Sequence, residues 1–320
     1  MKVSSFTREI KEELTLSWID VTSDLRISLL SAFIRANGVI SFSNRCENLT
    51  LEADNAQVIK FIYKQIKETI EDIDIHFYFR KTMKFNKSTR YAIEIKDASN
   101  ILDICKINFL ENKIAYSLTS KEDKIRAYLT GLFISNGSCN DPSSTNYHLE
   151  ISLKNEDYAK AVLKMVQKIK TKDFNFKLIK RRNNYVIYIK KSDLISDFLN
   201  FIDANDACFK FENTRMDRDL SNVTNRLINC DGYNYNKSIT NAQKQIKMID
   251  FIDSHLGIKN ITNEKVRNLC YLRKEFPEYS YLELSNELSK VLEQKVSKSN
   301  INHLFRKINE LAERLNYEDN

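Results

Sequence analysis

The sequence predicts an α+β fold in which a duplicated unit of helices and strands precedes an all-α domain. The first observation is a repeated nonapeptide, because "LSAFIRANG" at residues 30–38 matches "LTGLFISNG" at residues 129–137. The second is that the segments after the two nonapeptides also match. The third is a pair of consecutive capped helices near the end of the chain, which predicts the all-α domain. With 320 residues, of which 42% are hydrophobic, the chain is long enough for two or three domains.

The two copies follow the same order of predicted elements. After each nonapeptide comes a polar loop and a short strand, "LTLEA" in the first copy and "HLEIS" in the second. An amphipathic helix, a hairpin and another helix follow. Between residues 91–104 and 185–198, Tyr, Ile, Ile and Lys coincide at equal positions. We therefore predict a first copy with an N-terminal helix over residues 1–117, and a second copy over residues 118–205.

Positive charge gathers at the second hairpin of each copy. The segment "RKTMKFNKSTR" at residues 80–90 carries five cations and no acid, and residues 177–191 carry six and no acid. In the second copy, this hairpin is predicted to turn at Asn183–Asn184, because asparagine tolerates the left-handed conformation of a tight turn. Side chains alternate between the two faces of a strand. We therefore expect outward-facing side chains at Lys177, Arg181 and Lys190. The inward-facing side chains are expected at Leu178, Tyr185, Ile187 and Ile189. The candidate phosphate contacts here are Lys180, Arg181 and Arg182, although an ordinary solvated face is the alternative.

Both nonapeptides resemble the signature of the LAGLIDADG homing endonucleases. That resemblance implies a duplicated αββαββα saddle, in which two packed central helices lie beneath DNA-binding strands. Small residues fit the close approach of two helices, namely Ala32, Ala36, Gly131 and Ser135. In that family the eighth motif position is an acid that binds a divalent metal, whereas this chain has Asn37 and Asn136 there. Because an uncharged amide is a poor substitute for a carboxylate as a Mg²⁺ ligand, we expect no catalytic residue, no metal and no cofactor.

The segment over residues 206–237 is rich in Asn and Arg and is predicted to be a polar connector. Its candidate phosphate contacts are Arg218, Asn225, Arg226 and Lys237, and the alternative is that these side chains satisfy the connector's own backbone. A helical DNA-binding domain is predicted over residues 238–320. Its first helix is expected from Ser238 to His255, ended by Gly257, and its second from about Asn263 to Glu275.

The end of the chain predicts a helix-turn-helix at about residues 280–315. Ser280 and Glu283 form a capping box, and the helix that follows is expected to bury Leu284, Leu288 and Val291. Ser297 caps a second helix whose apolar stripe is Ile301, Leu304, Ile308, Leu311 and Leu315. The polar face of this helix supplies the candidate DNA-binding residues Lys298, Ser299, Asn302, His303, Arg306 and Lys307. Among them, Asn302 and Arg306 suit base edges, and Lys298 and His303 suit phosphates.

The combination of a nuclease-like double repeat and a C-terminal helix-turn-helix resembles the WhiA family of bacterial DNA-binding regulators of sporulation and cell division. The stretches that carry the resemblance are "AYLTGLFISNGSCNDP", "YHLEIS", "FENTRMDRDLSNVTNRLINC" and "VSKSNINHLFRKI". The resemblance implies a non-enzymatic transcription regulator with a role in cell division or chromosome segregation. Its expected partner is double-stranded DNA, and other regulators or the transcription machinery are further candidate partners.

Two other classes of function stay open at this point. One is an active nuclease that uses acids outside the motif, such as Glu52 or Glu150. The other is a nucleoid or partner-recruiting protein that binds DNA with little sequence preference. The sequence predicts no membrane span and no signal peptide, and hence a cytoplasmic, nucleoid-associated protein. Its six scattered cysteines predict neither a zinc site nor a disulfide framework. The operator, the oligomeric state and any effector are not predicted.

Overall fold

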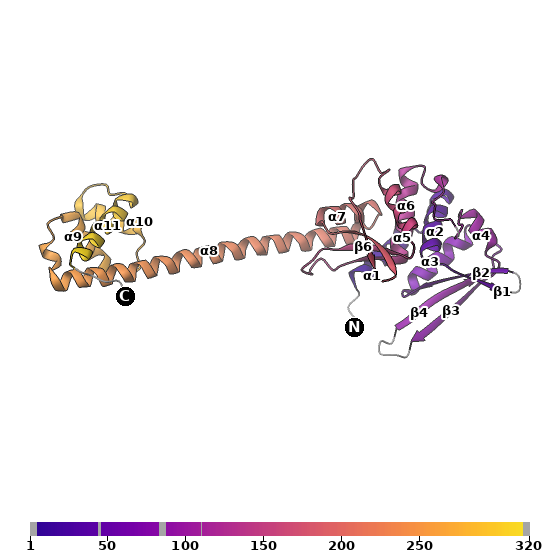
Figure 1. The fold of residues 1–320 in the computed structure, drawn as a ribbon, viewed down its shortest axis with the longest axis horizontal. Helices are drawn as coiled ribbons and strands as arrows, with labels where there is room; N and C mark the ends of the chain where they lie inside the picture. The colour runs from indigo at the N-terminus through magenta and orange to yellow at the C-terminus, as the bar shows by residue number, and fades with distance from the viewer. Residues whose placement is uncertain (1–4, 44–45, 83–87, 110, 316–320) are drawn as a thin grey trace. The chain divides into compact units, whose positions relative to one another are not determined.

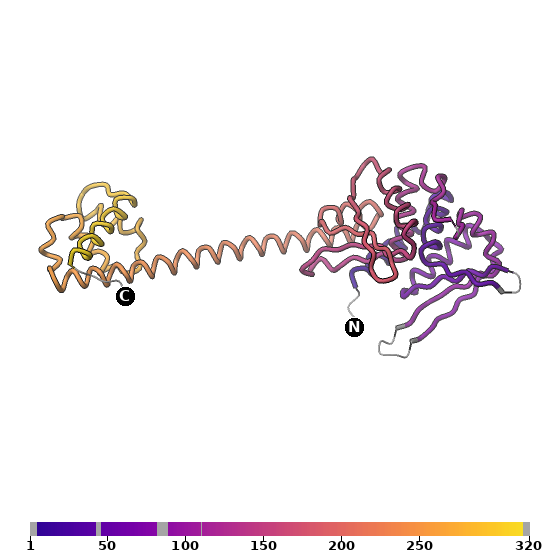
Figure 2. Tube along the Cα trace, viewed as in Figure 1, coloured from indigo at the N-terminus to yellow at the C-terminus, as the bar shows by residue number. Residues whose placement is uncertain are grey.

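The structure is a computed structural model that describes residues 5–43, 46–82, 88–109 and 111–315, traced in Figure 2 outside its grey segments. The chain divides into two compact units, residues 1–219 and 220–320. The first unit is a mixed α+β structure with two four-stranded sheets, and the second is helical. No helix in the described ranges is long and apolar enough to cross a membrane.

The first unit repeats one order of elements twice, as the sequence predicts. An N-terminal helix, α1 (Phe6–Ser17), precedes the first copy. The first copy consists of α2 (Ser23–Asn37), β1 (Val39–Ser43), β2 (Cys46–Ala53), α3 (Ala56–Lys67), β3 (Ile75–Thr82), β4 (Ser88–Ile95) and α4 (Ser99–Ile104). After a short 3-10 helix, η1 (Tyr116–Leu118), the second copy consists of α5 (Glu122–Asn136), β5 (Gly137–Cys139), β6 (Leu149–Leu153), α6 (Glu156–Val166), β7 (Lys177–Arg181), β8 (Asn184–Ile189) and α7 (Ser192–Phe201). The order helix, two strands, helix, two strands, helix is thereby confirmed.

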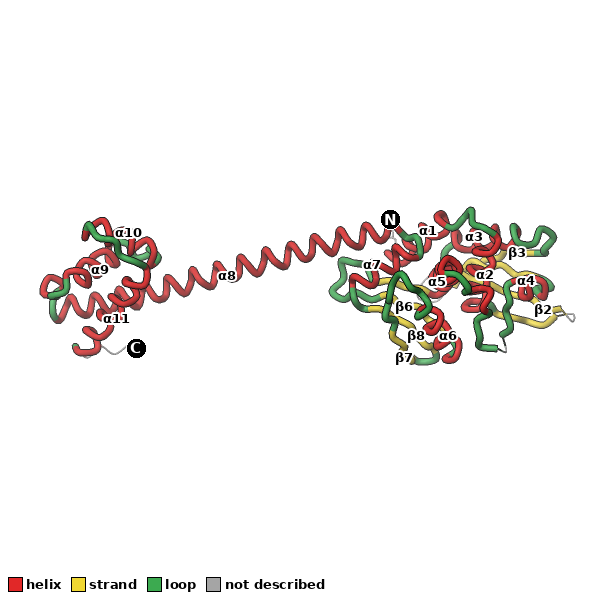
Figure 3. Tube along the Cα trace, turned by 90° about the horizontal axis from the view of Figure 1, so that it is seen from above, coloured by secondary structure: helices red, strands yellow, loops and turns green. Residues whose placement is uncertain are grey.

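The two sheets, whose strands are yellow in Figure 3, are antiparallel. They share one topology, with strand orders β1-β2-β4-β3 and β5-β6-β8-β7. Equivalent residues pair, since Leu49 faces Ile95 in the first sheet and Leu149 faces Ile189 in the second. Alternate residues of the central strands are buried on what we call the inner face: Leu49, Leu51, Ile93 and Ile95, and then Leu149, Ile151, Ile187 and Ile189. The helices α3 and α6 pack on the inner faces. The opposite face of each sheet is called the outer face.

The central helices α2 and α5 pack against one another (Figure 1), and small residues lie at their contact. Ala32 is fully buried, and a Cβ added to Gly131 would lie 2.2 Å from the carbonyl oxygen of Leu29 and 3.1 Å from the Ala32 Cβ. Only a residue without a side chain fits at that crossing. The two glycines that end the nonapeptides also serve close approach. A Cβ at Gly38 would meet the Ile34 oxygen at 2.5 Å, and one at Gly137 would meet the Phe133 ring at 2.4 Å.

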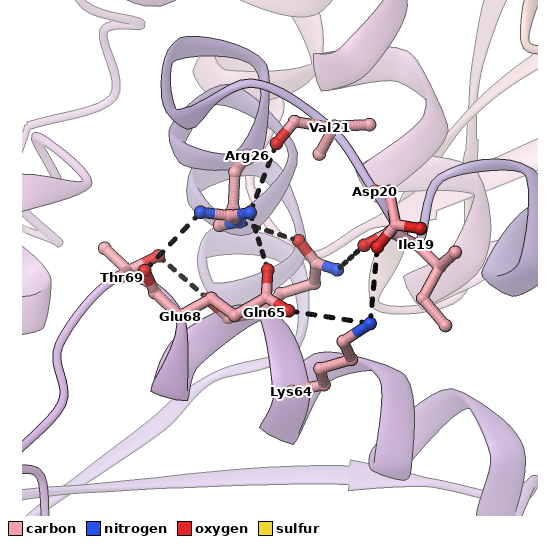
Figure 4. A network of polar contacts seen from close by, with 8 residues as sticks. All are labelled: Ile19, Asp20, Val21, Arg26, Lys64, Gln65, Glu68 and Thr69. Atoms are coloured by element: carbon pink, nitrogen blue, oxygen red, sulfur yellow. Dashed lines mark hydrogen bonds and ion pairs between the residues drawn. The ribbon is translucent and has the colours of Figure 1, made fainter.

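A polar network fixes the beginning of α2 against α3 (Figure 4). The Arg26 guanidinium donates to the Gln65 amide oxygen at 3.0 Å and to the Val21 carbonyl at 3.1 Å, and forms an ion pair with Glu68 at 2.5 Å. Gln65 is fully buried and donates to the Ile19 carbonyl at 2.9 Å. Buried polar groups cost stability unless they are hydrogen-bonded, so these contacts allow Gln65 to lie in the core.

The helix α8 (Asn205–His255) is one continuous element of 51 residues. Two predictions are therefore wrong, since this helix does not begin at Ser238 and the segment over residues 206–237 is helical. At its beginning, the Glu13 carboxylate accepts hydrogen bonds from the Asp206 and Ala207 N–H groups at 2.7 and 2.9 Å, which satisfies two donors that a helix N-terminus leaves open. Both ends of α8 also bury apolar side chains, such as Phe211 and Ile249. Because nucleation is the costly step, residues of low helix propensity between two anchored ends need only propagate the helix.

The rest of the second unit follows the sequence prediction closely. Gly257 ends the region of α8 with a φ of 79°, and a 3-10 helix η2 (Ile258–Asn260) leads to α9 (Glu264–Glu275), capped by Asn263. The capping box of Ser280 and Glu283 is present at the start of α10 (Tyr281–Leu292). The last helix is α11 (Lys298–Arg314). One core prediction is wrong, because Val291 is 54% exposed and lies on the outer side of α10.

Candidate nucleic-acid interface

The turn between α10 and α11 is held by backbone and hydroxyl contacts. Glu293 ends α10 in the left-handed conformation with a φ of 51°. The Ser289 hydroxyl donates to the Ser285 carbonyl at 2.6 Å and accepts from the Val296 N–H at 2.9 Å, so it ties the last turn of α10 to the residue before the cap of α11. The Ser297 side chain then accepts from the Asn300 N–H at 3.2 Å, as the capping prediction requires. These bonds fix the direction in which α11 leaves the turn.

A buried arginine packs against the core-facing side of α11. Arg273 of α9 is 1% exposed and donates to the carbonyl oxygens of Pro277 at 3.2 Å and Tyr279 at 2.7 Å. Its guanidinium lies 5.5 Å from the centre of the Phe305 ring, a residue of α11 that is itself buried. Burial lowers the pKa of Arg273 from its usual value. Sequence reasoning missed this residue, because nothing in the pattern around it separates a buried arginine from an exposed one.

The face of α11 opposite the core carries all six candidate residues of this helix. The stripe predicted as apolar is buried at Ile301, Leu304 and Ile308 and partly buried at Leu311 and Leu315. The exposed residues are Lys298, Ser299, Asn302, His303, Arg306 and Lys307. The cations among them lie in the first ten residues of α11, whereas Glu310 and Glu313 follow in the second half. Positive charge thus coincides with the helix N-terminus, where open backbone N–H groups also favour an anion.

The outer faces of the two sheets place cations beside carboxylates. In the first sheet Glu52 lies 3.7 Å from Arg80 and 3.8 Å from Arg90. In the second sheet Glu150 contacts Arg181 and His148, both at 2.7 Å. Each central strand therefore places a carboxylate beside the arginine of the neighbouring hairpin. This pairing lowers the net positive charge of the outer faces below what the cation-rich segments alone predict. Two cations of the first segment, Lys84 and Lys87, lie outside the described residues.

The turn of the second hairpin differs from the prediction by one residue. Arg181 pairs with Asn184, so the two residues of the turn are Arg182 and Asn183 instead of Asn183 and Asn184. Arg182 adopts a φ of 51°, which is strained for a residue with a long side chain. Its side chain is exposed at the tip. Lys180 lies beside Tyr185, with its Nζ 5.5 Å from the ring centre, and so faces the opposite side of the strand from Arg181.

The four candidate residues in the polar segment have different surroundings. The Arg218 guanidinium donates to the carbonyl oxygens of Ser144 at 2.6 Å and Thr145 at 3.0 Å and covers the Tyr147 ring at 5.2 Å. It therefore anchors the loop before β6 to α8. The other three candidates, Asn225, Arg226 and Lys237, have exposed side chains on α8. The structure does not bring these four residues together in one cluster.

The two asparagines at the motif ends make structural hydrogen bonds. The Asn37 side chain donates to the Glu52 carbonyl at 2.8 Å and accepts from the Glu52 N–H at 2.9 Å. The Asn136 side chain donates to the Ala36 carbonyl at 3.1 Å. Beside them, the Lys11 Nζ donates to the Ser135 carbonyl at 3.2 Å, and burial lowers the pKa of this lysine. The ends of the central helices are therefore joined by amide and ammonium donors.

The two acids considered for a nuclease, Glu52 and Glu150, lie on different sheets and contact cations. Within the described ranges, no group of three or more His, Cys, Asp or Glu side chains is arranged to hold a metal ion. The cysteines that are described include Cys105, Cys139 and Cys270, which are buried as free thiols.

Three family models match this chain. The model described as the WhiA N-terminal LAGLIDADG-like domain matches residues 23–107. The model of the WhiA LAGLIDADG-like domain matches residues 125–221, and that of the WhiA C-terminal HTH domain matches residues 224–312. The boundary between the last two models falls in α8.

Individual proteins are similar over nearly the whole length of the chain. Two proteins named probable cell division protein WhiA, from Staphylococcus aureus strains JH9 and Newman, are 36% identical over 315 residues, covering 97% of this chain and 97% of each relative. The crystal structure of full-length DUF199/WhiA from Thermatoga maritima has a TM-score of 0.58 at 23% identity and covers 99% of both chains. The crystal structure of the N-terminal LAGLIDADG domain of DUF199/WhiA has a TM-score of 0.50 at 24% identity, covering 62% of this chain and 90% of that one. The two structural likenesses show the fold.

Proposed function

The chain belongs to the WhiA family, and from this premise we propose that it is a non-enzymatic, sequence-specific DNA-binding protein that regulates transcription in cell division and chromosome segregation. The relatives from Staphylococcus aureus are named probable cell division proteins, which supports the cellular role. A cytoplasmic location on the nucleoid follows from this role. Other regulators or the transcription machinery are the further partners that we propose.

The observation that carries the proposal is the exposed N-terminal half of α11. A helix-turn-helix protein presents the beginning of its second helix to the base edges of the major groove. Asn302 and Arg306 lie one turn apart on the exposed face, with Lys298 at the helix start. An asparagine can bind adenine and an arginine can bind guanine with two hydrogen bonds each, so this pair is suited to reading sequence. Lys298, His303 and Lys307 are suited to the flanking phosphates.

The outer faces of the sheets are proposed to add affinity without sequence preference. Arg80 and Arg90 are 70% and 64% exposed in their side chains, and Arg181 is 49% exposed. Exposed arginines can contact phosphates, and this kind of contact depends strongly on salt. Their carboxylate partners, Glu52 and Glu150, hold them in place and limit the net charge. We therefore assign base reading to α11 and phosphate contact to the outer faces.

A non-catalytic role is supported by the amide hydrogen bonds of Asn37 and Asn136. Both side chains bind backbone carbonyls through their N–H groups, which orients a donor where the homing endonucleases have a metal-binding acid. A donor N–H repels a cation. The proposal is thus that the saddle was retained as a binding scaffold.

Footprinting on the DNA upstream of the protein's own gene, with random competitor DNA in excess, tests the proposed function. A protected site that survives the competitor is the expected result. Protection that disappears in proportion to the competitor would favour a low-specificity nucleoid protein. In parallel, supercoiled plasmid is incubated with the protein and Mg²⁺ or Mn²⁺, and metal-dependent nicking would favour the nuclease instead.

A further inference from the structure

A basic cavity lies on the side of the second copy that faces away from the outer strand surface. Its volume is about 580 Å³, and one wall is the segment over residues 112–119 that joins the two copies. The other wall is one face of α6 and its end, since the lining residues Asp157, Lys160, Ala161, Lys164, Met165 and Lys168 recur every three or four positions. Because α6 covers the inner face of its sheet, this cavity is separate from the candidate DNA-contacting strand face.

Four lysines line the cavity and only one acid does. The lysines are Lys113, Lys160, Lys164 and Lys168, and the acid is Asp157. Lys160 is paired with Glu156 at 2.7 Å. Within the part of the chain that the structure describes, the other three lysines form no ion pair. Lys164 lies in the last turn of α6 and Lys168 lies two residues beyond its end, so both line the cavity without a carboxylate partner among the described residues.

The first copy shows what the same helix face is like when its charges are neutralised. The caps Asn55 and Asn155 begin α3 and α6 at equivalent positions, which makes Lys64 the equivalent of Lys164 and Glu68 the equivalent of Lys168. Lys64 contacts Asp20 at 3.4 Å and Glu68 at 3.5 Å, within the network of Figure 4. Where the first copy has ion pairs around Lys64, the second copy has a cavity lined by lysines.

The chemistry of the walls indicates the kind of anion. Three uncompensated ammonium groups suit a ligand with several negative charges close together, such as a chain of phosphates. The cavity also has apolar contributions from Ile114, Ala161 and Met165, and its volume lies in the range of small-molecule sites. At its edge, the Tyr116 side chain is 74% exposed, with its ring centre 5.8 Å from the Lys168 Nζ. An exposed aromatic ring beside a cation offers a nucleobase a stacking surface.

We propose that this cavity binds a nucleoside polyphosphate, with its phosphates on Lys113, Lys164 and Lys168 and its base against Tyr116. Inorganic polyphosphate has the same phosphate chain and could bind the same lysines. Only the nucleotide has a base that can stack on Tyr116, so this contact distinguishes the two ligands. Because the ligand would contact both α6 and the segment that joins the copies, its binding would stabilise the first unit by mass action.

Calorimetric titration of the full-length chain with ATP, tripolyphosphate and adenosine tests the proposal. ATP is expected to bind with one site per chain, tripolyphosphate more weakly, and adenosine without detectable heat. Replacing Lys164 and Lys168 by alanine should weaken ATP binding at least tenfold, whereas Lys60→Ala with Lys177→Ala, two exposed lysines of the same unit, should change it less than twofold. Tyr116→Ala should reduce the affinity for ATP to that for tripolyphosphate. Unfolding curves of all variants verify that they are folded.

Three results would overturn the proposal. The first is the absence of saturable binding of both ATP and tripolyphosphate at millimolar concentration. The second is an equal loss of ATP binding in the cavity variant and in the lysine control, which would indicate unspecific attraction to a basic surface. The third is displacement of ATP by random duplex DNA in the wild type together with weaker binding of that DNA by the Lys164 and Lys168 variant, which would assign the cavity to nucleic acid.

Discussion

The side-chain amide of Asn37 binds the backbone of Glu52 in both directions, donating to its carbonyl at 2.8 Å and accepting from its N–H at 2.9 Å. Val39 pairs with Thr50 in the ladder between β1 and β2. Asn37 and Glu52 lie two residues beyond this pair, so the side-chain amide continues the hydrogen bonding of that ladder beyond β1. A carboxylate has acceptors only and can form one of the two bonds. Asn37, at the position where the homing endonucleases have an acid, therefore stabilises β2 through two hydrogen bonds.

Replacing Asn37 and Asn136 by aspartate together should lower the stability of the chain without creating a nuclease. Each change removes a donor and places an acceptor oxygen near a carbonyl, which costs roughly 1–3 kcal/mol per site. Urea unfolding measures the first effect and plasmid nicking with Mg²⁺ the second. Asn225→Asp with Asn229→Asp, which adds the same total charge at two exposed positions of α8, serves as the control. A double variant that stays as stable as this control and nicks plasmid would show that the amides have no structural role.

The contact between α2 and α5 predicts opposite effects for two glycine substitutions. Gly131→Ala should lower the free energy of unfolding by about 2 kcal/mol or more, because its Cβ would lie 2.2 Å from the Leu29 carbonyl and the helices would have to separate. Gly232→Ala on α8 should be neutral or stabilising by up to roughly 1 kcal/mol, since a Cβ there meets nothing within 4 Å and alanine is the better helix former. Thermal unfolding of both variants decides, and equal stability of the two would contradict the close helix contact.

The partly buried ammonium of Lys11 predicts a pH-dependent stability difference. Burial lowers the pKa of Lys11 below its usual 10.5, so the unfolded chain binds more protons than the folded one between the lowered value and 10.5. Wild-type stability relative to Lys11→Met should consequently rise as the pH rises through that window. At neutral pH, where the ammonium is charged, the methionine variant should be the more stable. Urea unfolding at pH 7 and pH 10 tests both points, and a methionine variant that is less stable by the same amount at both values would refute them.

The duplicated fold was predictable because it rests on patterns that are local in sequence. Apolar spacing, the matched nonapeptides and the capping box at Ser280 each specify their own element, and the structure has all of them. The start of α8 was not predictable in this way. Its middle is rich in asparagine, and it is helical because Glu13 and the buried Phe211 anchor its beginning and the buried Ile249 anchors its end. Contacts of this kind join segments that are far apart in the sequence.

The candidate site was predicted unevenly for the same reason. The exposed face of α11 follows from the apolar stripe that it opposes, so its residues could be read from helical spacing. Three other features depend on distant partners. Arg218 is engaged by a loop near Ser144, Arg181 is paired with Glu150, and Arg273 lies buried beneath Phe305. A sequence pattern does not show such partners, so the cation-rich hairpin segment did not indicate that Arg181 is paired with a carboxylate.

The tip of the second hairpin predicts a separation of stability from affinity. Arg182→Asn should leave the fold intact or slightly more stable, because asparagine tolerates a φ of 51° better than arginine does. If Arg182 contacts a phosphate, affinity for all DNA sequences should fall and the salt slope should decrease by about 1. Fluorescence anisotropy at several salt concentrations measures the slope. The control is Lys60→Ala, an exposed cation on α3, and it should change neither the affinity nor the salt slope. An unchanged slope for Arg182→Asn would assign its charge to solvent.

The measurement that tests the central claim most directly compares Arg306→Ala with wild type on the preferred site and on a scrambled duplex. Arg306 is exposed on α11, next to Asn302 and opposite the buried Ile308. Loss of a two-bond contact to guanine should cost roughly 1–3 kcal/mol on the preferred site and much less on the scrambled one. Arg314→Ala, an exposed arginine in the last turn of the same helix, is the matched control and should change neither affinity. If Arg306→Ala weakened both duplexes equally, Arg306 would be a phosphate contact, and if it weakened neither, α11 would not be the recognition helix.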